Sequence, residues 1–112
     1  MNMKLPPLVA KFVQAKNAYD STAFVACFAD QAVVHDEGKE MRGTIAIQKW
    51  IEASNKKYQD TLTVTNLVEH NNETVLTALV AGNFEGSPVS LDFHFSIKED
   101  KIDRLSILVA GE

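Results

Sequence analysis

The sequence predicts an α+β fold in which three N-terminal helices pack against one side of a curved, mostly antiparallel sheet. Two features of the apolar pattern lead to this prediction. In the first half of the 112-residue chain, most apolar residues recur at helical spacing. In the second half, apolar and polar residues alternate with the period of two that is typical of strands. Helices followed by consecutive strands indicate segregated layers and not alternating β-α units.

Length and composition predict a single domain that spans residues 1–112. The chain is 46% hydrophobic and 23% charged, with a net charge of −4, which is ordinary for one globular domain. Its single cysteine excludes an internal disulfide, and the sequence holds no Cys/His cluster that would suit zinc. No apolar run reaches the roughly 20 residues of a membrane-spanning helix, and no basic stripe suits a nucleic acid. We therefore expect a cytoplasmic protein without membrane or nucleic-acid partners.

Three segments of the first half have the pattern of helices. The first is predicted to begin at Pro7, because proline suits a first helical turn. Asp20 or Ser21 can cap the second, which we expect to end near Ala29. The third is predicted over residues 44–58. Its expected inward-facing residues are Ile45, Ile47, Trp50 and Ile51.

The remaining segments have the pattern of strands and turns. Residues 32–36 (AVVHD) predict a short strand, and residues 37–43 (EGKEMRG) predict a turn-rich loop. Four closing strands are expected over residues 61–70, 74–85, 90–98 and 101–110. In the third of these, one face should be buried and carries Leu91, Phe93, Phe95 and Ile97. The opposite face carries Ser90, Asp92, His94 and Ser96.

The segments FADQAVVHDEG and RGTIAIQKW, together with the four closing strands, resemble the nuclear transport factor 2-like superfamily. Its SnoaL-like and ketosteroid-isomerase-like branches match best, and the resemblance in element order covers nearly the whole chain. It implies a cystatin-like α+β cone, in which the sheet curls around the helices and leaves an apolar pocket open at one end. Since one fold supports many functions, the resemblance specifies the fold far more closely than the activity.

The resemblance also implies roles for particular residues. Beside a ketosteroid isomerase, the span from Phe12 to Asp36 aligns without a gap, which places Asp36 on the isomerase's general base. Three other residues, Phe28, Trp50 and Phe84, fall on positions that line the isomerase pocket. The full set expected to contact a ligand is Phe12, Phe28, Val34, Trp50, Val80, Phe84, Phe93, Phe95 and Leu105.

The sequence departs from the isomerase at the groups that stabilise the reaction intermediate. The isomerase holds its enolate with a tyrosine and a protonated carboxylic acid, and these donors correspond to Phe12 and Phe95. Neither phenylalanine can donate a hydrogen bond, and each lost donor removes about 2.7 to 4 kcal/mol of transition-state stabilisation. We therefore do not expect this chain to isomerise steroids by that mechanism.

Asp36 is the candidate catalytic residue. It shares a strand face with Val34, so its carboxylate should point to the buried side. A carboxylate among aromatic rings has a raised pKa, which suits it to act as a base near neutral pH or as a neutral donor. The alternative is an aspartate at the strand edge that caps a turn of the following loop.

Other chemistry-bearing residues favour structural roles. The pairs His35/Glu37 and Asp92/His94 have a spacing that could offer two metal ligands, but each lacks a third. For Asp92/His94, a cross-strand ion pair or an interface contact is the simpler interpretation. Cys27 has no cation near it in the sequence and is predicted to be a small buried hydrophobe. The two tyrosines, Tyr19 and Tyr58, are likewise predicted to be structural, as is His70 at a turn.

Three functions follow from these residues as open alternatives. The first is binding of a small, apolar or partly polar organic molecule, with Asp36 as anchor and no cofactor or metal. The second is proton transfer by Asp36, as in an isomerase or a polyketide cyclase, and the third is a non-catalytic association module. An open cavity of about 300 Å³ or more at Asp36 would favour the first two. We also expect a homodimer through the outer sheet face, which carries Thr63, Thr65, Thr77, Leu79, Asp92, His94, Ser106 and Leu108.

Overall fold

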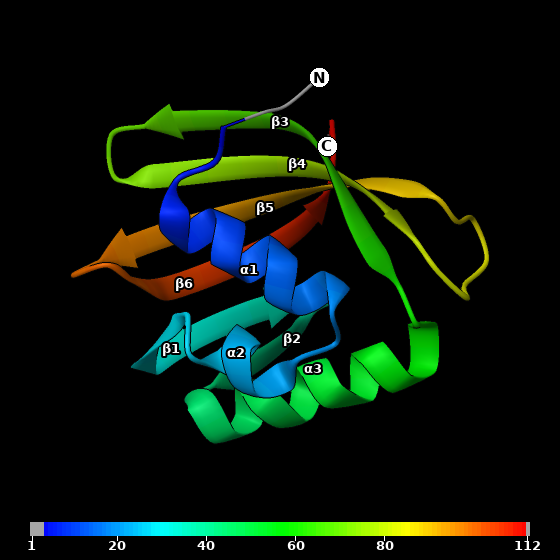
Figure 1. The fold of residues 1–112 in the computed structure, drawn as a ribbon, viewed down its shortest axis with the longest axis horizontal. Coiled ribbons are helices and arrows are strands. Elements are labelled where there is room, and N and C mark those ends of the chain that lie inside the picture. The colour runs from blue at the N-terminus through cyan, green and yellow to red at the C-terminus, as the bar shows by residue number, and fades with distance from the viewer. Residues whose placement is uncertain (1–3, 112) are drawn as a thin grey trace.

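The computed structural model describes residues 4–111, and within them the chain forms three helices and one six-stranded sheet (Figure 1). The helices are α1 (Pro7–Asn17), α2 (Ser21–Val25) and α3 (Thr44–Tyr58). The strands are β1 (Phe28–Asp36), β2 (Lys39–Arg42), β3 (Thr61–His70), β4 (Glu73–Ala81), β5 (Val89–Lys98) and β6 (Lys101–Val109).

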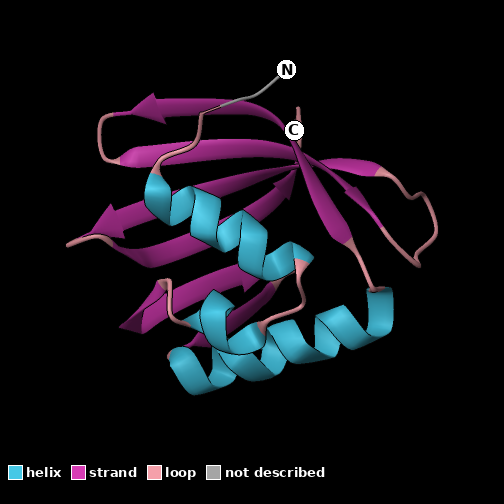
Figure 2. Cartoon of the chain, in the orientation of Figure 1, coloured by secondary structure: helices cyan, strands magenta, loops and turns pink. Residues whose placement is uncertain are grey.

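The strands follow the order β2-β1-β6-β5-β4-β3 across the sheet. Every neighbouring pair is antiparallel except β1 and β6, which run parallel. Short turns suffice for the antiparallel neighbours, whereas the parallel pair joins the N-terminal and C-terminal parts of the chain. All three helices cover the same face of the sheet (Figure 2). The predicted α+β class and the mostly antiparallel sheet are therefore confirmed.

The sheet curves around the helices because its ladders are interrupted at three places (Figure 1). Register shifts occur between Val64 and Asn66 in β3, between Ser96 and Ile97 in β5, and between Phe28 and Val33 in β1. Such irregularities bend a strand and increase its twist. The sheet therefore wraps partly around the helices, and a pocket lies between the two layers.

The helices begin and end where the local chemistry allows. Pro7 lies in the first turn of α1, where its missing N–H would have no partner in any case. The Asp20 side chain caps α2 by accepting a hydrogen bond of 3.0 Å from the Ala23 N–H. Gln59 ends α3 in the left-handed conformation, with φ of 48°. The predicted bounds of α3 coincide with those observed.

Two predicted segments are wrong because strand pairing overrides the local pattern. The second helix ends at Val25 and not near Ala29, since Phe28 already pairs with Ile102 of β6. The loop predicted over residues 37–43 contains β2, which forms a hairpin with β1. Its turn is the pair Glu37–Gly38, both with positive φ, which is the conformation that two-residue hairpins require.

Two smaller predictions also need correction. Ile45 was expected to face inward, but it is 74% exposed, because it lies on the solvent side of the first turn of α3. The strand predicted over residues 74–85 ends at Ala81, where the chain turns away into the loop before β5. Ile47 and Ile51 are buried as predicted.

The hydrophobic core lies between the helices and the inner face of the sheet. Its centre is Phe12 of α1, whose ring lies 4.9 Å from that of Phe24 and 5.0 Å from that of Phe95. Phe93 and Phe95 are both buried, as the alternation in β5 predicts. Burying a large apolar side chain contributes roughly 1.5 to 3 kcal/mol, so this aromatic cluster is the main tie between α1 and the sheet.

Candidate functional site

A pocket of about 950 Å³ opens between the helix layer and the sheet. Its wall combines α1, α3, the end of β1 and the loop between β4 and β5. At the rim it extends to the outer face of the sheet at His35, Ser106 and Leu108. This volume lies at the upper end of the roughly 300 to 1,000 Å³ that is usual for pockets that bury a drug-sized molecule.

Asp36 lies at the end of β1 on the wall of this pocket. The strand alternation places it on the same side as Val34, which is fully buried. The pKa of Asp36 is raised to about 6, first by burial and then by the neighbouring charge of Glu37. A hydrogen bond from the Trp50 side chain lowers the pKa, and the charge of Asp60 raises it. The carboxyl group therefore changes its protonation state close to neutral pH.

Trp50 lies on the same side of α3 as the buried residues Ile47 and Ile51, and from there its side chain lines the pocket. Its ring centroid lies 6.2 Å from that of Phe24. The indole therefore combines an apolar surface for a ligand with one N–H that interacts with the Asp36 carboxylate.

Five of the nine residues expected to contact a ligand lie on the pocket wall. These are Phe12, Trp50, Val80, Phe84 and Phe93. Their contact with a ligand stays a prediction. The other four, Phe28, Val34, Phe95 and Leu105, are not part of the wall and belong to the hydrophobic core.

These four residues differ from the other five because they lie deeper in the molecule than the pocket wall. Alternation assigns a residue to the inner face of the sheet, but helices cover part of that face directly. Phe95 meets the ring of Phe12 edge-on at 5.0 Å, and Phe28 lies 5.3 Å from Phe24. Both are consequently covered by α1 and α2. Phe12 and Phe95, which were expected to correspond to the isomerase's donors, thus form an aromatic contact, and of the two only Phe12 borders the pocket.

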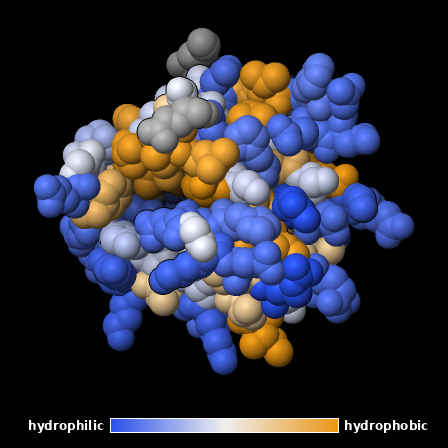
Figure 3. Space-filling model, turned by 180° about the vertical axis from the view of Figure 1, so that it is seen from behind, coloured by the Kyte–Doolittle hydropathy of each residue, from blue (hydrophilic) through white to orange (hydrophobic). Residues whose placement is uncertain are grey.

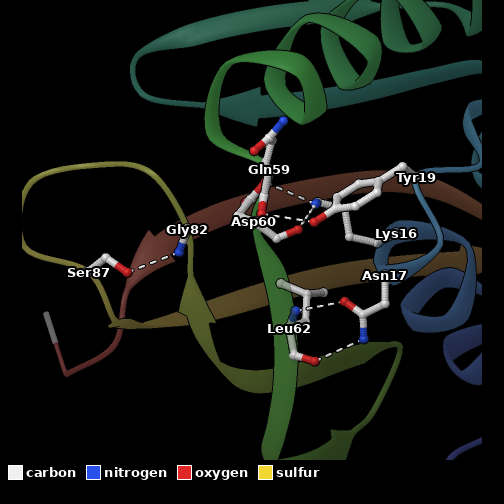
Figure 4. A network of polar contacts seen from close by, with 8 residues as sticks. All are labelled: Lys16, Asn17, Tyr19, Gln59, Asp60, Leu62, Gly82 and Ser87. Carbon is white, nitrogen blue, oxygen red and sulfur yellow. Dashed lines mark hydrogen bonds and ion pairs between the residues drawn. The ribbon is translucent and has the colours of Figure 1, made fainter.

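Sequence reasoning missed a buried ion pair on the pocket wall. Lys16 of α1 and Asp60, between α3 and β3, both line the pocket (Figure 4). The Lys16 Nζ donates to the Asp60 Oδ1 at 3.0 Å and to the Asp60 carbonyl oxygen at 2.7 Å. A usable signal was present, because Lys16 lies one helical turn after Phe12 on the buried side of α1.

The other polar candidates form contacts within the protein. His94 lies 3.1 Å from Glu73 of the neighbouring strand, and Asp92 accepts a hydrogen bond of 2.6 Å from the Thr77 hydroxyl. His35 lies 3.8 Å from Glu40 across the β1–β2 hairpin. Within residues 4–111, no three His, Cys, Asp or Glu side chains come together as a metal site would require.

Cys27 is buried, and both tyrosines contact other parts of the chain. Burial raises the pKa of the Cys27 thiol, although the structure brings Lys101 and Lys11 near enough to oppose this effect. The Tyr19 hydroxyl donates to the Gln59 carbonyl oxygen at 2.8 Å. Tyr58 lines the pocket and packs edge-on against Phe84, with ring centroids 5.9 Å apart.

No helix in the described part of the chain has the length and apolar character needed to cross a membrane. The longest, α3, has 15 residues and both charged and polar positions. 

Comparison with known proteins relates the chain to a family. Residues 9–105 match the family model described as the SnoaL-like domain. No curated protein sequence matches the chain significantly. Among solved structures, a candidate polyketide cyclase from Sinorhizobium meliloti is 35% identical, with a TM-score of 0.90. That match covers 93% of this chain and 95% of the other.

More distant structures share the fold alone. A protein from Catenulispora acidiphila, with a ketosteroid isomerase-like fold and solved in complex with trimethylamine, is 17% identical with a TM-score of 0.85. The match covers 96% of this chain and 88% of that one. A protein from Methylobium petroleophilum with a cystatin-like fold is 15% identical with a TM-score of 0.80, over 94% and 74% of the two chains.

Proposed function

Since the chain belongs to the SnoaL-like domain family within the nuclear transport factor 2-like superfamily, we propose that its pocket binds a small, largely apolar organic molecule. Asp36 is the polar anchor in this proposal. The observation that carries it is the large open pocket at Asp36, whose wall combines aromatic and aliphatic side chains with a smaller number of charged ones. Apolar walls with a few convergent polar groups are the usual form of a small-molecule site.

Proton transfer by Asp36 is the second candidate function. Its support is the pKa of about 6, since a general base works best when its pKa lies near the operating pH. The similarity to a candidate polyketide cyclase points the same way. A ligand with an acidic C–H beside a carbonyl group would suit this chemistry. The association module finds less support, because it requires no open pocket.

Binding can be tested with tetralin, an apolar bicyclic probe, by ligand-detected NMR. Ser54→Trp should abolish binding, because Ser54 lies on the pocket wall and an indole there would occupy the space. Ala53→Trp is the matched control, since the neighbouring Ala53 is exposed and is not part of the wall. Equal binding to both variants, or no binding to the wild type, would contradict the proposed binding function.

Proton transfer can be tested separately with 2-tetralone, the ketone related to tetralin. In deuterium oxide, a base that removes the proton between ring and carbonyl replaces it with deuterium. Asp36→Asn should retain binding and lower the protein-dependent exchange rate by a factor of about 10² or more. An exchange rate that is unchanged in this variant would eliminate Asp36 as the base while leaving the binding function intact.

We further propose that the protein forms a homodimer through the outer face of its sheet. This face bears exposed Leu79 and Leu108 among polar side chains, and Figure 3 shows apolar areas within a largely hydrophilic surface. A mixed surface of this kind suits a self-complementary interface. Sedimentation at micromolar concentration should show a dimer, and Leu108→Glu should shift it toward monomer. A purely monomeric wild type would refute the proposal.

A further inference from the structure

We propose that Lys16 is the group that recognises the ligand, by donating a hydrogen bond from its ammonium to a ketone or enolate oxygen. This inference rests on the proposed function of the pocket and specifies the chemical class of its ligand. The expected ligand is an uncharged, largely apolar ketone with an acidic C–H beside the carbonyl group.

Lys16 lies in an unusual environment for a lysine. Its side chain is only 7% exposed, although α1 offers solvent on its other side. Val9, Phe12 and Ala15 on the same helix are buried in the core. An ammonium at such a position is costly unless it is paired and hydrogen-bonded. Asp60 supplies that partner, since its carboxylate lies 3.0 Å from the Lys16 Nζ.

The ammonium retains one donor that the protein does not use. A lysine ammonium carries three N–H groups, and Lys16 directs two bonds to Asp60, at 2.7 and 3.0 Å. Among residues 4–111, no further oxygen or nitrogen accepts a hydrogen bond from it, and the Nζ lies over the Tyr19 ring, 5.3 Å from the ring centroid. Because Lys16 lies on the pocket wall, a ligand oxygen can take the remaining donor.

The segment that holds Lys16 is fixed from the side of α1 (Figure 4). The Tyr19 hydroxyl bonds to the Gln59 carbonyl oxygen at 2.8 Å. Asn17 bonds to both backbone groups of Leu62, at 2.7 and 3.0 Å. These bonds lie on either side of Asp60 in the chain and leave it little freedom. A donor that is fixed in advance costs little to align when the ligand binds.

The same segment is fixed from the β4–β5 loop. The Asn83 N–H donates to the Tyr58 carbonyl oxygen at 2.7 Å. Gly82 approaches Asp60 so closely that a Cβ at Gly82 would lie 2.7 Å from the Asp60 Cβ. The Ser87 hydroxyl accepts a bond of 2.9 Å from the Gly82 N–H, which holds the loop in this position (Figure 4).

Charge balance determines which oxygen the site accepts. Lys16 and Asp60 neutralise each other, so a carboxylate ligand would bring an uncompensated charge into the pocket beside Asp36. A ketone brings none. If the Asp36 carboxylate removes the proton beside the carbonyl, the electron pair of the C–H bond forms the enolate and the negative charge moves to the oxygen. Lys16 then supplies the stabilisation that Phe12, one turn earlier on α1, cannot give.

The test compares 2-tetralone with tetralin, which differ by the carbonyl oxygen. The wild type should bind the ketone about tenfold more tightly or better, since hydrogen bonds from charged groups are the strong ones. Lys16→Met should remove this preference, which is the ratio of the ketone and tetralin affinities measured on the same variant. Lys11→Met is the control, because Lys11 is an exposed lysine of the same helix outside this pocket and should keep the preference.

A second set of variants separates ligand recognition from a merely structural role. Lys16→Met leaves Asp60 buried without a partner, so the double variant Lys16→Met with Asp60→Asn provides a neutral pair that should fold. Asp60→Asn alone keeps the lysine and should keep the ketone preference while lowering the thermal midpoint. If Lys16 only holds α1 to β3, all these variants retain the wild-type preference, and the inference is wrong although tetralin still binds. If neither probe binds the wild type, the proposed function itself fails.

Discussion

Phe12 and Lys16 lie one turn apart on the buried side of α1, and they face two different environments. Phe12 is packed against the rings of Phe24 and Phe95. Lys16 meets Asp60, and both line the pocket. The difference teaches that two residues one turn apart on the same helix face can meet an apolar and a polar environment, because different segments of the chain pack over each of them.

The aromatic contacts around Phe12 can be weakened by Phe95→Ala. A phenylalanine that is 1% exposed and packed against Phe12 should cost about 3 to 5 kcal/mol of unfolding free energy when truncated. Ser96→Ala, on the opposite face of β5, should cost little. Denaturant unfolding of both variants measures the difference, and equal losses would mean that the two faces of β5 contribute alike.

The ion pair between Lys16 and Asp60 can be removed by Lys16→Met, which leaves the Asp60 carboxylate without its partner. Removal of one member of a buried pair costs about 3 kcal/mol, and the side chain of Asp60 is only 13% exposed. The double variant with Asp60→Asn should recover most of this loss, because no unpaired charge remains. Thermal unfolding of the single and double variants tests this, and an additive loss in the double variant would contradict it.

The segment that contains Asp60 can be displaced by Gly82→Ala. The added Cβ would lie 2.7 Å from both the Asp60 Cβ and the Tyr58 carbonyl oxygen, so backbone must move. We expect a loss of about 1 to 3 kcal/mol, with weaker ketone binding as Asp60 shifts. Glu85→Ala, an exposed change in the same loop, should stay within about 0.5 kcal/mol. Calorimetry that finds both variants equal would show that the close approach is tolerated.

Substitution of Asp36, at the end of β1, should have the smallest effect on stability. The pKa of Asp36 is about 6 in the folded protein against 3.8 as its ordinary value, so between pH 4 and 6 the folded state holds a proton that the unfolded state has lost. Stability therefore falls as the pH rises through this window. Asp36→Asn removes the penalty and should gain about 1 kcal/mol at pH 7, a value reduced because water reaches the half-buried group.

The measurement for this prediction is the difference in unfolding free energy between wild type and Asp36→Asn as a function of pH. The difference should be near zero at pH 3.5, where the carboxyl is protonated in both states. It should grow through pH 4 to 6 and stay constant above. A difference that is independent of pH would show that burial does not perturb Asp36.

The sequence alone determined which residues share a face. Period-two alternation placed Phe93 and Phe95 inside, and the helical pattern of residues 44–58 matched α3 at both ends. The same reasoning put Asp36 on the side of Val34, which the pocket wall agrees with. These results depend on neighbours along the chain, and the side-chain directions of a strand or helix repeat with a fixed period.

Only the tertiary structure decided how deep each inner residue lies and what it meets there. Phe95 and Leu105 are on the predicted face, yet they lie in the hydrophobic core and not on the pocket wall. Lys16 and Asp60 are 44 residues apart, and nothing local brings them together. A period fixes direction but not depth or partner, because these depend on which segments return to pack over a given point of the sheet.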